Sequence, residues 1–153
     1  MKASEPLTAM DLLELQQLAA EYWARADGDM SLDLANLFTE DAELVLGSLR
    51  LAGRDAIERF FRERDATQLA QQRATRHIAC NHRTTLIDAD RALVRSTVLV
   101  YVGNGPLPMQ SGAPSGIADF EDICVRAAAR PWLFERRSGQ TVFVGPGAAS
   151  FAR

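Results

Sequence analysis

The chain has 153 residues, which is the size of one ordinary domain and enough to bury a hydrophobic core. A hydrophobic fraction of 47% and a charged fraction of 24% are those of a soluble globular protein, and a net charge of −3 gives no electrostatic reason to expect a nucleic acid or an anionic membrane as partner. No apolar run approaches the roughly 20 residues of a membrane span, and the first residues lack the apolar stretch of a secretory signal. Cys80 and Cys124 are therefore expected to be reduced and buried, and a cytoplasmic protein is expected.

Helices are predicted first along the chain. Between Leu12 and Ala26, apolar residues recur at steps of three and four, which is the stripe of an amphipathic helix. Gly28 suits the end of this helix, and Ser31 suits the N-cap of a second, short helix over residues 31–38. A third helix follows Gly53, because helical spacing of large apolar residues returns there.

The other segments predict strands. Residues 42–53 predict two short strands around Gly47-Ser48, and longer strand-like runs cover 73–87, 91–102, 117–126 and 132–144. The order of elements predicts an α+β fold, with a curved antiparallel sheet wrapped over about three helices. We expect one domain over residues 1–153, with its core at about 10–144 and an irregular tail at 145–153.

Both histidines lie in the strand predicted over 73–87. Side chains alternate faces along a strand, so His77 and Asn81 share one face and His82 points to the other. The two histidines then cannot bind one metal ion unless the strand bulges, and no other metal-binding spacing occurs in the chain. We expect no metal site. His77 is either a working residue or a core histidine bonded to a backbone carbonyl.

Asp27 stands at the edge of the first helix's buried stripe. It follows Trp23 by four residues and so lies on the same side of the helix. A carboxylate in that position is partly desolvated and needs a partner such as a histidine, an arginine or a tyrosine hydroxyl. The alternative is a helix-terminal aspartate bonded to nearby backbone groups.

Four stretches carry a family resemblance over about residues 10–144. They are "YWARADGDMSLDLANLFTEDAEL", "LAGRDAIERFF", "RATRHIACNHRTTLIDADRALVRSTVLVY" and "GIADFEDICVRAAARPWLFERR". In this order they resemble the SnoaL-like, scytalone dehydratase-like branch of the nuclear-transport-factor-2-like superfamily. The resemblance implies a cone-shaped α+β fold, a curved antiparallel (mixed) sheet around the helices.

The resemblance also implies a chemistry. Scytalone dehydratases and hexachlorocyclohexane dehydrochlorinase carry an Asp–His pair inside the cone, and the matching positions here are Asp27 and His77. His77 would be a general base, and Asp27 would fix its tautomer and stabilise the imidazolium. The implied activity is that of a cofactor-independent lyase or isomerase acting on a small hydrophobic cyclic or aromatic molecule.

Four further residues are predicted to bind substrate. Asn81 shares the face of His77, Arg126 ends a strand near the mouth of the cone, and Tyr22 and Trp23 lie on the first helix. Each has an alternative: Arg126 forms a salt bridge, Tyr22 belongs to the core, and Asn81 satisfies neighbouring backbone. The chain departs from the dehydratases in having few tyrosines and in the predicted outward orientation of its second histidine.

Two other functions stay open. Parts of the same stretches resemble the small β subunit of aromatic-ring-hydroxylating dioxygenases, which would bind a larger oxygenase subunit. A binding protein for a small hydrophobic ligand is the third alternative, and it predicts that Asp27 and His77 do not touch. The superfamily resemblance implies a homodimer or homotrimer, and the breaker-rich segment 103–116 is a candidate lid or partner contact.

Overall fold

The computed structural model describes residues 6–128 and 130–153. These residues form two α-helices, α1 (Ala9–Ala26) and α2 (Arg54–Ala70), and two 3₁₀ turns, η1 (Leu34–Asn36) and η2 (Ser150–Ala152). The strands are β1 (Phe38–Leu46), β2 (Leu49–Ala52), β3 (Arg73–Asp88), β4 (Arg91–Asn104), β5 (Gly116–Val125) and β6 (Leu133–Val144).

The helix α1 begins and ends where local chemistry requires. Thr8 caps it: its hydroxyl accepts the N–H of Asp11 at 3.1 Å, and the Asp11 carboxylate accepts the N–H of Thr8 at 3.0 Å. At the other end Asp27 is the C-cap, and Gly28 follows with φ of 107°. This conformation favours glycine and turns the chain away from the helix axis.

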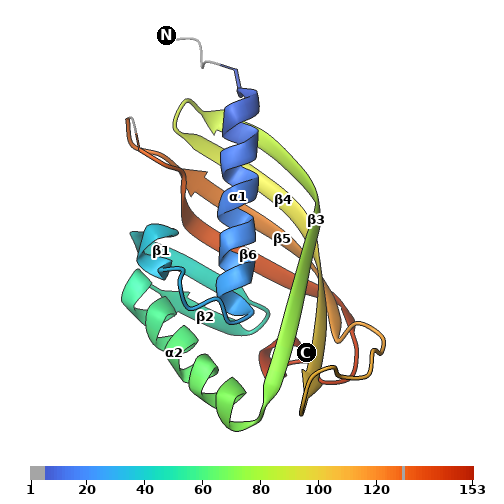
Figure 1. Ribbon diagram of the computed structural model, residues 1–153. Coiled ribbons are helices and arrows are strands. Elements are labelled where there is room, and N and C mark those ends of the chain that lie inside the picture. The colour runs from blue at the N-terminus through green and yellow to red at the C-terminus, as the bar shows by residue number, and fades with distance from the viewer. Residues whose placement is uncertain (1–5, 129) are drawn as a thin grey trace.

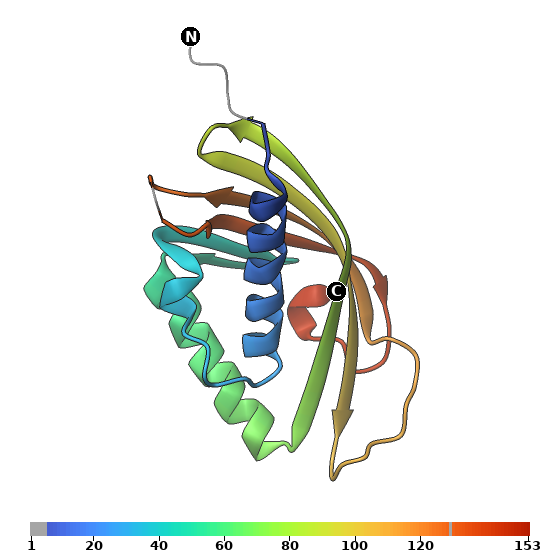
Figure 2. The same ribbon diagram turned by 45° about the horizontal axis from the view of Figure 1, so that its top comes forward.

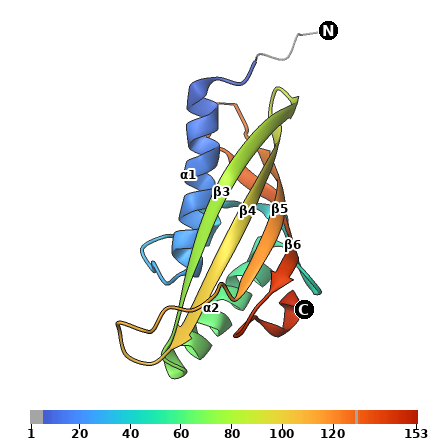
Figure 3. The ribbon, with the colours of Figure 1, turned by 90° about the vertical axis from the view of Figure 1, so that its right-hand side faces the viewer.

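The strands form one curved sheet in the order β2-β1-β6-β5-β4-β3. Neighbours are antiparallel except β1 and β6, which are parallel, and the edge strands β2 and β3 leave the sheet open. The curved sheet wraps around α1, which lies along its concave face (Figures 1 and 2). From the side, α1 lies beside the long strands, and the loop after β4 extends past the end of the sheet (Figure 3). The predicted α+β cone is confirmed.

The core fills the space between the helices and the concave face. The α1 stripe contributes Leu15, Leu18, Tyr22 and Trp23, all at most 7% exposed. One cluster joins these side chains to α2 and to the inner residues of β1, β4, β5 and β6. Burial of this apolar surface holds α1 in place and thereby fixes where its C-terminal residue lies.

A bulge in β3 overturns one prediction. Cys80 pairs with Thr97, but Arg83 pairs with Arg95, so β3 has one extra residue there, and Asn81 takes φ of 55°. After the bulge, the alternation of side chains between the two faces of β3 is shifted by one residue. His82 therefore points to the interior, on the same face as His77, and Asn81 is exposed. The predicted faces of both residues are wrong for this reason.

Other predictions are confirmed with small changes. The strands and their turns lie where expected, but the second helix is only the 3₁₀ turn η1. Cys124 is buried as expected, whereas Cys80 is only half-buried, and both are free thiols. None of the helices in the described part of the chain is long and apolar enough to cross a membrane.

Candidate active site

A cavity of about 740 Å³ lies at the wide end of the cone. Its walls come from the end of α1, one side of α2, the inner faces of β3 to β6, and the C-terminal tail. The tail, predicted as irregular, has a defined place here. The backbone carbonyl of Phe151 accepts the N–H of Ser48 at 3.1 Å, and the ring of Phe151 lies edge-on to that of Phe60. The tail thus closes part of the cavity.

Asp27 and His77 are in direct contact beside this cavity. The Nδ1 atom of His77 lies 2.6 Å from Oδ1 of Asp27, and the backbone N–H of His77 donates to Oδ2 at 2.8 Å. The second bond exists because β3 is an edge strand, so alternate N–H groups face away from β4. Thr75, two residues earlier on the same face, donates its hydroxyl to Oδ1 at 2.7 Å.

These contacts determine the charge of Asp27. Burial raises the pKa of its carboxyl, but the hydrogen bonds and charge of His77 and the Thr75 hydroxyl together outweigh burial and lower the pKa below the ordinary 3.8. Asp27 is therefore an anion at neutral pH and accepts a proton-bearing Nδ1. The lone pair of a neutral His77 ring then belongs to Nε2, which no described residue hydrogen-bonds.

Trp23 holds the imidazole from its face. The two rings are 4.4 Å apart between centroids and 17° from parallel. This stacking limits rotation of the His77 ring and favours the imidazolium when it forms. Trp23 and Tyr22 both border the cavity, although Tyr22 is only 1% exposed, and their contact with a substrate stays a prediction. Burial raises the pKa of the Tyr22 hydroxyl to about 12, so it is neutral.

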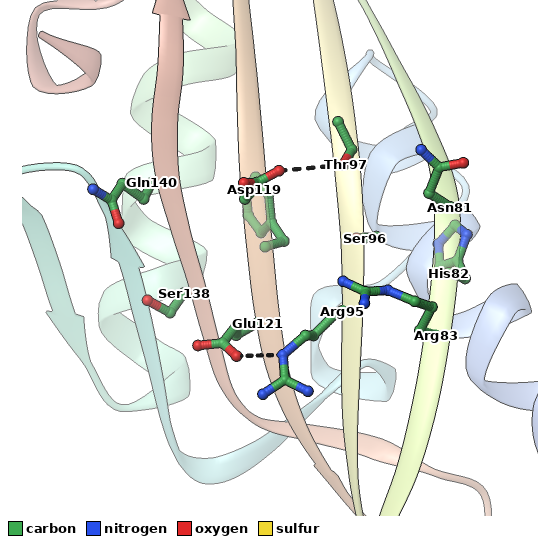
Figure 4. Close-up of a pocket in the computed structure, with 11 residues that line it drawn as sticks. Asn81, His82, Arg83, Arg95, Ser96, Thr97, Asp119, Glu121, Ser138 and Gln140 are labelled. Atoms are coloured by element: carbon green, nitrogen blue, oxygen red, sulfur yellow. Dashed lines mark hydrogen bonds and ion pairs between the residues drawn. The ribbon is translucent and has the colours of Figure 1, made fainter.

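Two predicted substrate contacts lie elsewhere. Asn81 lines a second hollow of about 720 Å³ on the outer face of the sheet, beside the Arg95–Glu121 ion pair at 2.7 Å (Figure 4). Arg126 bonds to the Asp11 carboxylate at the start of α1, the salt bridge that was the alternative. Neither residue lines the cavity that holds His77.

A buried ion pair lies deeper in the cone. Arg137 and Asp122 are 0% and 1% exposed, with Nε and Oδ1 3.4 Å apart. The guanidinium also lies 4.6 Å from the ring centre of Trp23. Burial raises the pKa of Asp122 to about 6, against the attraction of Arg137. Nε2 of His82 and Oγ of Ser96 are also buried, and neither atom has a hydrogen-bond partner among the described residues.

Sequence reasoning missed Thr75, Arg64 and the tail. Thr75 lies two residues before His77, and this spacing places it on the same face of the strand. No sequence pattern indicated that its hydroxyl donates a hydrogen bond to Asp27. Among residues 6–128 and 130–153, no group of three His, Cys, Asp or Glu side chains could hold a metal ion. The expectation of no metal or cofactor stays a prediction.

Comparisons with known proteins show the family and the fold of this chain. The profile of the SnoaL-like domain matches residues 8–138. Solved structures share the fold. One is a protein named "Putative Scytalone Dehydratase" from Novosphingobium aromaticivorans, with a TM-score of 0.73 and 24% identity over 92% of this chain and 89% of that one. No curated protein matches.

Two further structures have the same architecture. ActVI-ORFA from Streptomyces coelicolor has a TM-score of 0.75 and 19% identity, covering 91% of this chain and 100% of that one. The hexachlorocyclohexane dehydrochlorinase LinA type 2 has a TM-score of 0.71 and 17% identity, covering 93% of this chain and 95% of that one. At these identities the likeness shows the fold.

Proposed function

The chain belongs to the SnoaL-like domain family, and from that premise we propose that it is a cofactor-independent lyase or isomerase acting on a small cyclic or aromatic molecule. One observation carries the proposal. The His77 ring borders the cavity while its Nδ1 lies 2.6 Å from the Asp27 carboxylate. This arrangement supplies a base whose free nitrogen, Nε2, has no protein partner among the described residues.

In the proposed reaction, Nε2 of His77 removes a proton from a carbon next to an electron-withdrawing group. The electron pair of the broken C–H bond forms a double bond. In an elimination the leaving group departs with its own electron pair, and in an isomerisation His77 returns the proton to another carbon. Asp27 stabilises the imidazolium in between. General-base assistance of this kind is worth ~10²–10⁴ in rate.

Proton exchange tests this proposal even though the natural substrate is not identified. Cyclic β-hydroxy and β-halo ketones would be incubated with the protein in D₂O, and loss of the α-proton or formation of the enone followed by NMR. We expect catalysis by the wild type and a loss of ~10²–10⁴ in His77→Gln. His82→Gln is the matched control, because His82 does not line this cavity. Equal rates in His77→Gln and wild type, or no exchange across the panel, contradict the proposal.

The two alternatives stand differently. The ligand-binding protein predicted that Asp27 and His77 do not touch, whereas their side chains are hydrogen-bonded. The small-subunit alternative remains a prediction, and purification from the native source would show it as a complex with a much larger oxygenase subunit. A homodimer or homotrimer and a cytoplasmic location also remain predictions. Exposed Ile78 and Val142 give the strands apolar surface for self-association.

A further inference from the structure

Two arginines line one wall of the cavity. Arg64 projects from α2, and Arg73 begins β3, where it shares the inner face with Thr75 and His77. Arg64 and Arg73 are both half-buried. Burial has the largest effect on Arg64 and lowers its pKa, the charges of Asp27 and Asp65 raise that pKa, and the nearby charge of Arg73 lowers it. Arginine stays protonated under such conditions, so this wall carries two positive charges.

Asp27 and Asp65 attract Arg64 from a distance, but among the described residues neither Arg64 nor Arg73 has a carboxylate in direct contact. Arg25 pairs with Asp65 at 2.7 Å, and the buried Arg137 pairs with Asp122 at 3.4 Å. In the described part of the chain, no carboxylate lies within ion-pair distance of Arg64 or Arg73. A half-buried cation without a counter-ion is unfavourable, and two adjacent cations are more so.

Their hydrogen-bond partners are neutral and leave donors unused. Arg64 donates to the Ala26 carbonyl, to Oε1 of Gln68 at 3.3 Å and to Oγ1 of Thr75 at 3.4 Å. Arg73 donates to the carbonyl of Gly147 at 2.9 Å. A guanidinium has five N–H groups, so both side chains keep N–H groups for a further acceptor at the cavity.

The two arginines are placed for a molecule that also reaches His77. Thr75 joins them to the dyad, because its hydroxyl lies near Arg64 and donates to Asp27. Along β3, the Cα atoms of Arg73 and His77 are ~13 Å apart, and the arginine side chain shortens that span. Many of the other lining residues are apolar, among them Val100, Val102 and Ile117, and the polar ones include Glu63 and Gln68.

We propose that Arg64 and Arg73 together bind the carboxylate of the substrate, which is then a ring compound with an acid group at one end and an acidic C–H at the other. Carboxylates accept two parallel N–H bonds from a guanidinium, and the anion supplies the missing counter-charge. As a statement about the substrate, this inference rests on the proposed function. The proposal that the two arginines bind an anion does not depend on the proposed function.

Calorimetric binding of two ring-matched probes tests the site. The probes are 2-naphthoate and 2-naphthamide, which differ in charge and little in shape. At low ionic strength, we expect wild type to bind the carboxylate about tenfold or more tightly than the amide. Arg64→Gln and Arg73→Gln should each reduce that preference to about threefold or less, with the amide affinity unchanged. Arg62→Gln, an exposed arginine on the same helix that does not line the cavity, should retain it.

The amide probe separates a lost charge from a damaged fold. Arg64 also supports the end of α1 through its hydrogen bond to Ala26, so an Arg64→Gln variant that binds neither probe has lost the cavity. In that case Arg73→Gln is the deciding variant, because the Arg73 side chain bonds only to the tail residue Gly147 among the described residues. No preference in wild type, or a full preference in Arg73→Gln, overturns the inference. Absence of proton exchange together with a retained preference would count against the proposed function and leave the anion site standing.

Discussion

Replacing Asp27 by asparagine should destabilise the protein in a pH-dependent way. The carboxylate accepts three hydrogen bonds, at 2.6 Å and 2.8 Å from His77 and at 2.7 Å from Thr75. Hydrogen bonds to a charged group contribute ~1.5–3 kcal/mol each, but an amide oxygen replaces some of them, and the side chain is partly open to solvent. We therefore expect a loss of ~2–3 kcal/mol in the free energy of unfolding at pH 7.

The sign of the pH dependence follows from the lowered pKa of Asp27. The folded state holds the proton of this carboxyl less tightly than the unfolded state does. Its contribution to stability is complete above pH ~4 and disappears as the pH falls through the folded-state pKa. The difference in the free energy of unfolding between wild type and Asp27→Asn should consequently become smaller below pH 4.

Urea unfolding at several pH values would measure this gap. Asp29→Asn makes the same change two residues along, at an exposed aspartate whose carboxylate accepts hydrogen bonds from Ser31, and should cost less than ~0.5 kcal/mol. An equal effect of the two substitutions at pH 7 would refute the reasoning. So would a gap for Asp27→Asn that stays constant or widens as the pH falls below 4.

Three further predictions concern other parts of the fold. Asp122 has a raised pKa of about 6, so the free energy of unfolding of wild type relative to Asp122→Asn should fall by on the order of 1–3 kcal/mol as the pH rises from 4 to 6. Urea unfolding would measure this, and a difference between the two proteins that does not change with pH contradicts it. Gly47→Ala puts a Cβ against the Phe151 carbonyl at φ of 57°, so amide hydrogen exchange in residues 147–152 should accelerate, with a cost of ~1–3 kcal/mol; unchanged exchange would show that the tail is not held there. Arg126→Gln should lower stability by ~1 kcal/mol and leave proton exchange on ketones unchanged; a tenfold slower exchange would return Arg126 to the active site.

The family resemblance implies the pairing of Asp27 with His77, and two sequence patterns agree with it. The apolar stripe of α1 predicts the side of the helix on which Asp27 lies, and strand alternation predicts that His77 shares one face with its neighbours at steps of two. Both patterns are local and uninterrupted over the residues concerned, up to Ala79. The long hairpin, the edge position of its first strand and the end of α1 then bring the two side chains together.

The errors come from features without a local pattern. A single extra residue at Cys80–Arg83 reverses the faces of Asn81 and His82. No glycine or proline lies in this stretch to mark the bulge in the sequence. Arg126 sits near its predicted strand end, but its partner is Asp11, 115 residues away in the sequence. The tail lacks periodicity, and its place over the cavity follows from its contacts with Ser48, Phe60 and Arg73.

The protonation of the His77 ring tests the central claim most directly. A two-bond ¹H–¹⁵N correlation spectrum, recorded at a pH where the ring is neutral and assigned with His82→Gln, reports which ring nitrogen carries the proton. Because Asp27 accepts a hydrogen bond from Nδ1, the account predicts a protonated Nδ1 and an unprotonated Nε2 in wild type. A proton on Nε2 would leave His77 without a lone pair toward the cavity and would contradict its role as the base.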